Sequence, residues 1–231
     1  MCVCVRARVL LLQRRRGWSP SASESSNGTR EVQESAKRLC RESLQEEPGV
    51  APAPSCALDP LNPPLSHFEY EDLERDRAKY FLYYAAILAA CRQKLGEVQD
   101  DTPRETPPAI LVLGAGHGRL VTLALEAARE ALQGMPCSAP FSVEVLDANP
   151  EAIAFLRSAF RHRRDVTVHE AVLVGASAPK PPSVLRLRTA CDIVVSEVFG
   201  SFGDNEFLPE ISAEAAFFAR PRAIIIPASW E

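Results

Sequence analysis

Two glutamates carry the clearest chemical signal in this sequence. Glu197 and Glu206 lie in the segment 196–206, which reads SEVFGSFGDNE and follows the strand-like run 192–195. Two glycines inside the segment let it turn back, so both carboxylates can approach one planar cation from opposite sides. The guanidinium of arginine is the natural planar cation of proteins, and its N–H groups match carboxylates in pairs. The loop therefore predicts chemistry on an arginine side chain.

A glycine-rich turn follows an apolar strand further upstream. The run 109–113 leads directly into Gly114, Gly116 and Gly118, and a helical pattern begins after them. Glycines at such a turn let the backbone take positive φ and let a ligand approach the amides. A dinucleotide-binding turn would have its third glycine at Arg119, whereas the spacing here is similar to the adenosylmethionine loop of class I methyltransferases. The turn predicts a nucleotide-like ligand, and a tight turn without a ligand is the alternative.

Asp147 stands at the end of the second strand-like run. A carboxylate at that position can accept both ribose hydroxyls of an adenosyl group, in NAD and in adenosylmethionine alike. The alternative is that Asp147 caps the helix that begins at Pro150, but Asn149 already fills that role. We therefore interpret Asp147 as a ribose-binding residue.

The composition limits the class of protein. The chain has 231 residues, of which 46% are hydrophobic, which is enough for one domain with a real core and a tail. Its net charge of -4 argues against nonspecific nucleic-acid binding and fits a protein that meets basic partners. Seven cysteines without a Cys-x-x-Cys pair indicate neither a disulfide framework nor a metal site, and favour a reducing intracellular compartment. No apolar run approaches the length of a membrane span.

Residues 1–57 are expected to be largely disordered or a wrongly predicted start. The first 23 residues hold five arginines and no acid, which is similar to an organelle transit peptide, although we prefer the disordered interpretation. A short amphipathic helix is expected over 29–46, and a proline-rich linker over 48–64.

Strong helix formers fill residues 70–95 and predict a single helix that Gly96 ends. We interpret Tyr83 and Tyr84 on its apolar side as core aromatics. The polar segment 97–108 is expected to connect this helix to the main domain.

From residue 109 onward, strand-like and helical patterns alternate. This order predicts an α/β fold, a Rossmann-like domain over 109–231 with a mostly parallel sheet and helices on both faces. The expected strands are 109–113, 142–146, 166–169, 191–195 and 223–226. The expected helices are 118–132, 151–160 and 211–218.

With these features in order, residues 58–227 resemble the protein arginine N-methyltransferases, and most closely the group of protein arginine N-methyltransferase 5, the symmetric-dimethylating (type II) branch. The segment 196–210 is similar to the double-glutamate loop of that branch almost residue for residue. The segment 70–80, YEDLERDRAKY, is similar to the helix that closes over the cofactor in that family. Residues 58–108 would then hold this helix and a connector.

The resemblance implies S-adenosylmethionine as the cofactor and methylation of protein arginine as the activity. It implies a catalytic role for Glu197 and Glu206, and a substrate-binding role for these two residues and Leu73. It also implies further residues that bind the cofactor. Together with the glycines and Asp147 argued above, the expected cofactor-binding residues are Tyr70, Lys79, Tyr80, Gly114, Gly116, Gly118, Asp147 and Leu173.

The sequence departs from the pattern of that branch at three places. Leu73 stands where the branch has a phenylalanine associated with symmetric product geometry, so the product type is open. Val172 stands near the expected adenine-binding acid, for which Glu170 could substitute. The β-barrel and the amino-terminal TIM barrel of the branch are expected to be missing from this chain, and with the TIM barrel the binding site for a WD-repeat partner.

The resemblance also suggests substrates and location. The expected partners are proteins with arginine/glycine-rich segments or histone tails, without direct contact to nucleic acid or membrane. The expected location is the cytoplasm and nucleus, with an organelle as the weaker alternative. Two other functions stay open: a noncatalytic scaffold that retains the cofactor pocket, and an NAD-dependent oxidoreductase.

Overall fold

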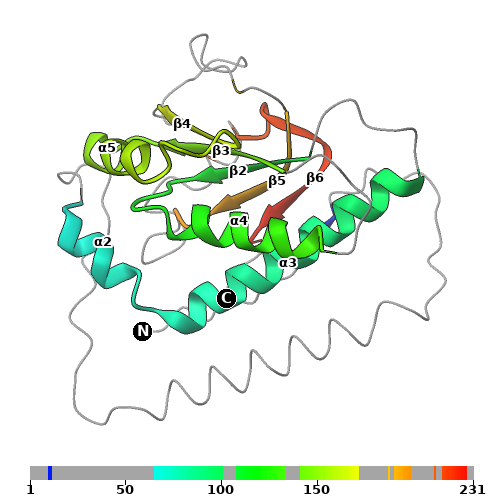
Figure 1. The fold of residues 1–231 in the computed structure, drawn as a ribbon, viewed down its shortest axis with the longest axis horizontal. Helices are drawn as coiled ribbons and strands as arrows, with labels where there is room; N and C mark the ends of the chain where they lie inside the picture. Colours follow the sequence, from blue (N-terminus) through cyan, green and yellow to red (C-terminus); the bar gives the residue numbers. More distant parts are fainter. Residues whose placement is uncertain are drawn as a thin grey trace.

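The computed structural model describes residues 10–11, 65–100, 108–133, 141–171, 187, 190–198, 211 and 215–227. Within them the chain forms a six-stranded sheet in the order β1-β6-β5-β2-β3-β4 (Figure 1). The strands are β1 (Leu10–Leu11), β2 (Ala109–Leu113), β3 (Ser142–Asp147), β4 (Val166–Glu170), β5 (Cys191–Ser196) and β6 (Ala219–Ile226). Only β1 pairs antiparallel, with β6, and the other neighbours are parallel. The predicted Rossmann-like α/β fold is confirmed.

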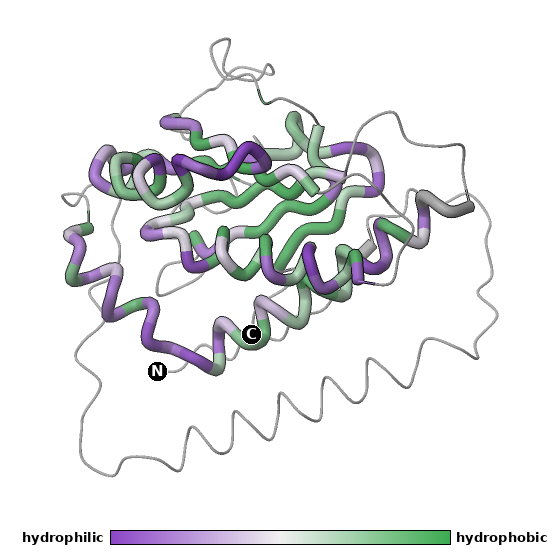
Figure 2. Tube along the Cα trace, in the orientation of Figure 1, coloured by the Kyte–Doolittle hydropathy of each residue, from purple (hydrophilic) through white to green (hydrophobic). Residues whose placement is uncertain are grey.

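The central strands are buried along their whole length and are largely apolar. All residues of β2 and β5 are buried, and the strands are the most hydrophobic stretch of the backbone trace (Figure 2). A parallel strand needs this pattern because layers cover both of its faces. The four strands expected between 109 and 195 each lie within one residue of the observed bounds.

One face of the sheet is covered by three helices. These are α3 (Arg77–Asp100), α4 (Arg119–Ala131) and α5 (Pro150–Ala159). Buried side chains of α3 and α4, such as Ile87 and Val121, share one core cluster with alternate residues of the strands, such as Val112. Helix α3 lies against α4 and runs beneath the sheet (Figure 1).

The helix expected over 70–95 is in fact two helices, and Gly96 does not end the second. The short helix α2 (His67–Leu73) is followed by a break at 74–76, and α3 continues through Gly96. Asp76 explains the break, because its carboxylate accepts a hydrogen bond from the Lys79 amide at 2.9 Å and caps a new helix there. Glu69 caps the start of α2 by accepting from the amide of Ser66 at 2.7 Å.

The opposite face of the sheet carries a second core. Leu111, Leu146 and Val194 pack there with Ala215 and Phe218. Of the helix expected over 211–218, residues 211 and 215 are helical and 212–214 lie outside the described residues, whereas 216–218 form a turn, so the predicted end at 218 is wrong. The helix over 29–46 and the linker over 48–64 lie outside them too. None of the described helices has the length and apolar character needed to cross a bilayer.

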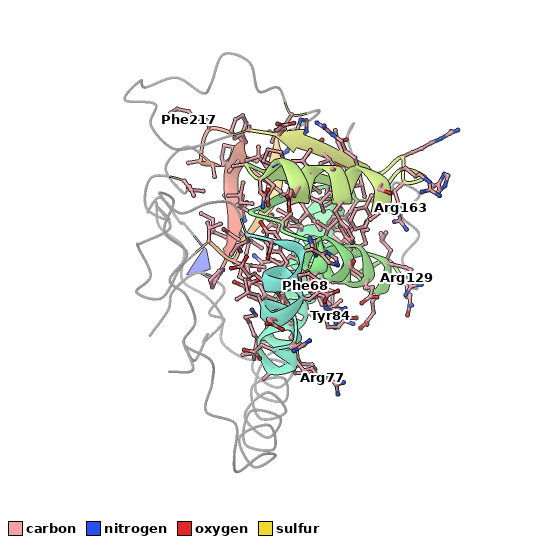
Figure 3. The ribbon with its side chains drawn as sticks, turned by 90° about the vertical axis from the view of Figure 1, so that its left-hand side faces the viewer. Phe68, Arg77, Tyr84, Arg129, Arg163 and Phe217 are labelled. Carbon is pink, nitrogen blue, oxygen red and sulfur yellow. The ribbon has the colours of Figure 1, made fainter. Side chains whose placement is uncertain are left out.

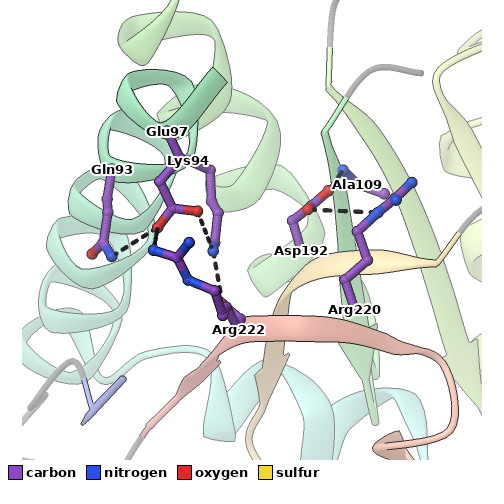
Figure 4. Close-up of polar contacts among 7 residues, drawn as sticks. All are labelled: Gln93, Lys94, Glu97, Ala109, Asp192, Arg220 and Arg222. Atoms are coloured by element: carbon purple, nitrogen blue, oxygen red, sulfur yellow. Dashed lines mark hydrogen bonds and ion pairs between the residues drawn. The ribbon is translucent and has the colours of Figure 1, made fainter. Parts of the chain in front are cut away.

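Helix α3 is fixed to the sheet by a buried lysine. Lys94 is 3% exposed, and its ammonium donates to the carbonyl oxygen of Arg222 on β6 at 2.7 Å and to Glu97 at 2.9 Å (Figure 4). Nearby, Asp192 on β5 accepts from the amide of Ala109 on β2 at 2.9 Å. Because a buried ammonium without partners is costly, these bonds define how α3 lies against the sheet.

Candidate active site

The site lies where the order of the strands reverses. The chain proceeds from β2 outward to β3 and β4, and then returns to place β5 on the other side of β2. In open α/β sheets the crevice between two such strands, at their carboxyl ends, is where ligands bind. Leu113 and Ser196 are register partners, so Gly114 and Glu197 leave the sheet side by side.

The three glycines shape the turn after β2. Gly114, Gly116 and Gly118 have φ of 63°, 52° and 89°, in the left-handed region that other residues avoid. A Cβ on Gly114 would overlap Cγ1 of Val198, so the turn and the segment after β5 touch at this point. The glycine turn and Glu197 therefore belong to one packed unit.

Asp147 braces the same turn from β3. Its Oδ2 accepts a hydrogen bond from the Gly116 amide at 2.8 Å, and its Oδ1 accepts from the Asn149 amide at 2.8 Å. The side chain is 7% exposed, and burial raises its pKa against the opposing effect of these amide bonds. Asn149 caps α5 by accepting from the Glu151 amide at 3.0 Å, so the cap assigned to Asn149 is confirmed.

Helix α2 stands over the glycine turn. A Cβ on Gly116 would lie 2.8 Å from the Tyr70 ring, so only glycine permits this contact. The Tyr70 hydroxyl accepts from the side-chain amide of Asn149 at 3.0 Å, and its ring centroid lies 4.7 Å from that of His117. On the outer side of α2, Phe68 is exposed (Figure 3).

A second contact joins α2 to the turn through two histidines. His67 Nδ1 lies 3.3 Å from His117 Nε2, and His117 stacks on Phe155 of α5 with ring centroids 4.4 Å apart. Burial and the neighbouring His67 lower the pKa of His117. This contact needs one imidazole to accept while the other donates.

The first turns of α3 hold Glu197. Lys79 forms an ion pair with its Oε1, and the Tyr80 hydroxyl donates to its Oε2 at 3.1 Å. Burial raises the pKa of Glu197, while the charge of Lys79 and the bonds from Lys79 and Tyr80 oppose this rise. The Glu197 side chain keeps 25% of its surface exposed, so the carboxylate is confined but reachable.

The comparison with known proteins assigns the family. Residues 43–226 match the model of the family described as PRMT5 arginine-N-methyltransferase. The chain belongs to this family. It is 34% identical over 177 residues to protein arginine N-methyltransferase 5 of Oryza sativa subsp. indica, an alignment that covers 74% of this chain and 24% of that protein.

Other members of the PRMT5 family align with this chain to a similar extent. Protein arginine N-methyltransferase 5 of Xenopus laevis is 31% identical, over 75% of this chain and 25% of its own. Protein arginine N-methyltransferase skb1 of Schizosaccharomyces pombe is 34% identical, over 66% of this chain and 21% of its own. The chain therefore spans about a quarter of the length of these relatives.

The predicted site residues of this PRMT5-family chain divide into two groups. The first group lies on α2, on the first turn of α3, in the turn after β2, or at the carboxyl ends of β3 and β5; its members are Tyr70, Leu73, Lys79, Tyr80, Gly114, Gly116, Gly118, Asp147 and Glu197. Glu206 and Leu173 lie outside the described residues, as does Val172. The roles proposed for all of them in cofactor and substrate binding stay predictions.

Lys79 and Tyr80, which the resemblance implies as cofactor contacts, both contact Glu197 here. Lys79 also donates to the carbonyl oxygen of Leu73 at 3.1 Å, which ties the end of α2 to the same acid. Leu73 itself is 40% exposed. Glu170, considered for the adenine, is exposed and lies 3.6 Å from Arg157.

Sequence reasoning missed two parts of this site. Tyr83 lies in the core as predicted, but the helical pattern does not show that its hydroxyl donates to the Ser196 carbonyl oxygen at 2.7 Å. Sequence reasoning also did not foresee the contact between His67 and His117. The helical spacing of Tyr80 and Tyr83 could have indicated that both point at one strand end, but not which one.

Proposed function

We propose that this chain is the methyl-transfer domain of a protein arginine N-methyltransferase and uses S-adenosylmethionine as cofactor. The observation that carries the proposal is the position of Glu197, which leaves β5 beside Gly114 at the reversal point of the sheet. A nucleoside pocket and an acid that could bind a guanidinium then share one crevice. Membership in the family supports this over hydride transfer with NAD.

The residues at the turn fit S-adenosylmethionine. Asp147 is a buried carboxylate at the carboxyl end of β3, and a carboxylate there suits a ribose diol. The turn itself carries no glycine at Arg119 for a pyrophosphate, and this cofactor has none. When bound, the cofactor would supply a sulfonium methyl group as the electrophile.

Glu197 would bind and orient the substrate guanidinium. Its carboxylate would accept N–H groups of the guanidinium, and Glu206 would take the other side. The pKa of a guanidinium is above about 12, so a free side-chain base cannot remove its proton in advance. Orientation is therefore the main contribution of the protein, and it can supply on the order of 7 to 11 kcal/mol.

The raised pKa of Glu197 is consistent with this role. Burial favours the protonated form of this acid, and a cation bound beside it favours the ionised carboxylate. At present Lys79 provides that cation at Oε1. An arginine substrate would have to share or replace this contact.

We propose arginine/glycine-rich segments or histone tails as substrates, with symmetric dimethylarginine as the product. The net charge of -4 supports basic substrates. We further propose that the protein acts in the nucleus and cytoplasm. Leu73, at the position associated with product geometry, makes the product type the part to measure first.

The test combines binding and transfer. Calorimetry with S-adenosylmethionine should show one site, and transfer of a tritiated methyl group to a glycine/arginine-rich peptide should follow. The Glu197→Gln variant should keep cofactor binding and lose about a hundredfold in rate, since one preorganised charge is worth roughly 3 kcal/mol. Glu130→Gln is the matched control, because Glu130 pairs with Arg92 on the surface of α4.

The outcomes separate the candidate functions. Cofactor binding without methyl transfer would favour the noncatalytic scaffold. Absence of cofactor binding would contradict both this proposal and the scaffold.

A further inference from the structure

Tyr83 is a buried tyrosine whose hydroxyl donates a hydrogen bond to a backbone carbonyl oxygen. The residue is 2% exposed, and its hydroxyl donates to the carbonyl oxygen of Ser196 at 2.7 Å. The ring packs in the core between α3 and the sheet. Burial, and after it the charge of Glu197, raise the pKa of Tyr83, so the hydroxyl keeps its proton and stays a donor.

Ser196 is the residue at which the protein chain leaves the sheet. It is the last residue of β5, and its pairing with Leu113 is the last one between β2 and β5. Glu197 follows it directly. A strand fixes the backbone up to its end, but the direction taken afterwards depends on what holds the final carbonyl group. The Tyr83 hydroxyl holds this carbonyl group. The segment that follows is held separately and more weakly, because the Ser196 hydroxyl accepts from the Val198 amide at 3.3 Å.

Two tyrosines of α3 therefore bind two neighbouring residues of one segment. Tyr80 donates to the carboxylate of Glu197, and Tyr83, three residues later on the same side of α3, donates to the backbone just before it. Their ring centroids lie 6.5 Å apart. Lys94 fixes the carboxyl-terminal part of α3 to β6, so the tyrosines at the start of the helix hold Glu197 in a defined position relative to the sheet.

We infer that Tyr83 is a positioning residue, whose buried hydroxyl sets the place of the Glu197 carboxylate through the Ser196 carbonyl group. The inference rests on the proposed function where it concerns methyl transfer. Its structural part, that removal of one hydroxyl displaces Glu197, holds or fails without any activity. A residue that served only the core would contribute through its ring, which phenylalanine retains.

The test compares two single-atom deletions on one helix. Tyr83→Phe removes the proposed positioning hydroxyl, and Tyr84→Phe removes the neighbouring hydroxyl, which donates to Glu130 away from the site. Each variant keeps its ring, and each loses one hydrogen bond to an oxygen. Carbon NMR of protein labelled at the glutamate carboxyl carbons would follow the titration of Glu197, assigned with Glu197→Gln.

We expect Tyr83→Phe to shift the Glu197 carboxyl signal and its titration midpoint, while Tyr84→Phe leaves both unchanged. Methyl transfer to the glycine/arginine-rich peptide should lose about tenfold to a hundredfold in kcat, with the KM for the cofactor within twofold. Incorporation of 4-aminophenylalanine at position 83, which restores a donor, should return the NMR signal toward that of the parent protein.

An unchanged Glu197 titration in Tyr83→Phe would overturn the inference, as would an equal change in Tyr84→Phe. If the parent protein transfers no methyl group, the proposed function fails while the NMR comparison still decides the inference. If the titration shifts but kcat of an active parent protein does not fall, Tyr83 is structural and the positioning role is wrong.

Discussion

Alanine at position 114 would test whether the glycine turn and Glu197 form one unit. The backbone of Gly114 has φ of 63°, and a side chain in this region costs about 1–2 kcal/mol of folding free energy. The added Cβ would also lie under 3.0 Å from Cγ1 of Val198, whereas ordinary contact begins at 3.4 Å. Val198 would have to move by about 1 Å, and Glu197, which precedes it in the chain, would be displaced with it; a misplacement of about 1 Å can cost on the order of a hundredfold in rate.

The measurement pairs urea unfolding with the methyl-transfer rate at a temperature where both proteins are folded. Gly96→Ala is the control, because Gly96 lies inside α3 with open space around it. That variant should gain about 0.5–1 kcal/mol of stability and keep the parent rate. A Gly114→Ala protein that is folded and transfers methyl groups within twofold of the parent rate would refute the coupling between the turn and Glu197.

Three further changes have defined outcomes. Asp147→Asn should weaken S-adenosylmethionine binding by about tenfold in calorimetry, because hydrogen bonds to a carboxylate are roughly twice as strong as neutral ones; unchanged affinity would exclude the ribose role. The pKa of His117 is lowered from 6.5, so the unfolded chain binds more protons and stability should fall as pH drops below 6.5. His117→Asn should flatten that part of a melting profile between pH 7.5 and 5, and an unaltered profile would contradict the role of its contact with His67. Lys94→Met should cost about 1–3 kcal/mol in urea unfolding, since the Arg222 carbonyl group loses its donor, and a neutral effect would refute the role of Lys94 in fixing α3.

The strands of the main sheet could be predicted because their apolar runs have the length and composition of buried parallel strands. The last strand was recognised only from residue 223, whereas β6 begins at Ala219. Pro221 disfavours a strand because proline has no amide donor, and Arg222 has a φ of 70°, outside the range of a regular strand. The pairing of β6 with β5 and β1 outweighs that local preference.

The division between α2 and α3 shows a different limit. No glycine or proline marks the break at 74–76, and Glu74 and Arg75 are good helix formers. The local signal is Asp76 as a cap, which is weak because aspartate is common on helix surfaces. Asp76 caps α3, but the place of α2 depends on the packing of Tyr70 against Gly116, and this tertiary contact cannot be seen in a helical pattern.

The candidate site was predictable in its residue types and not in its contacts. Glycines after a first strand and an acid after the second follow from what an adenosyl group requires. Tyr80 and Glu197 are 117 positions apart, so no local spacing announces that one donates to the other. The family resemblance supplied Lys79 and Tyr80, but as cofactor contacts and not as partners of Glu197.

The topology of the sheet places Glu197 at the carboxyl end of β5, beside the glycine turn, and residues of α3 provide the partners of its carboxylate. A half-buried anion needs a cation, and Lys79 supplies it from the first turn of α3. Under the proposed function, a guanidinium entering the site exchanges one cation for another at Oε1 and adds no net charge to the buried region. Such an exchange avoids most of the desolvation cost of burying a new charge pair. The same contact therefore stabilises the free protein and leaves Glu197 ready for a planar cation, and Tyr80 and Tyr83 keep the acid in position while that exchange takes place.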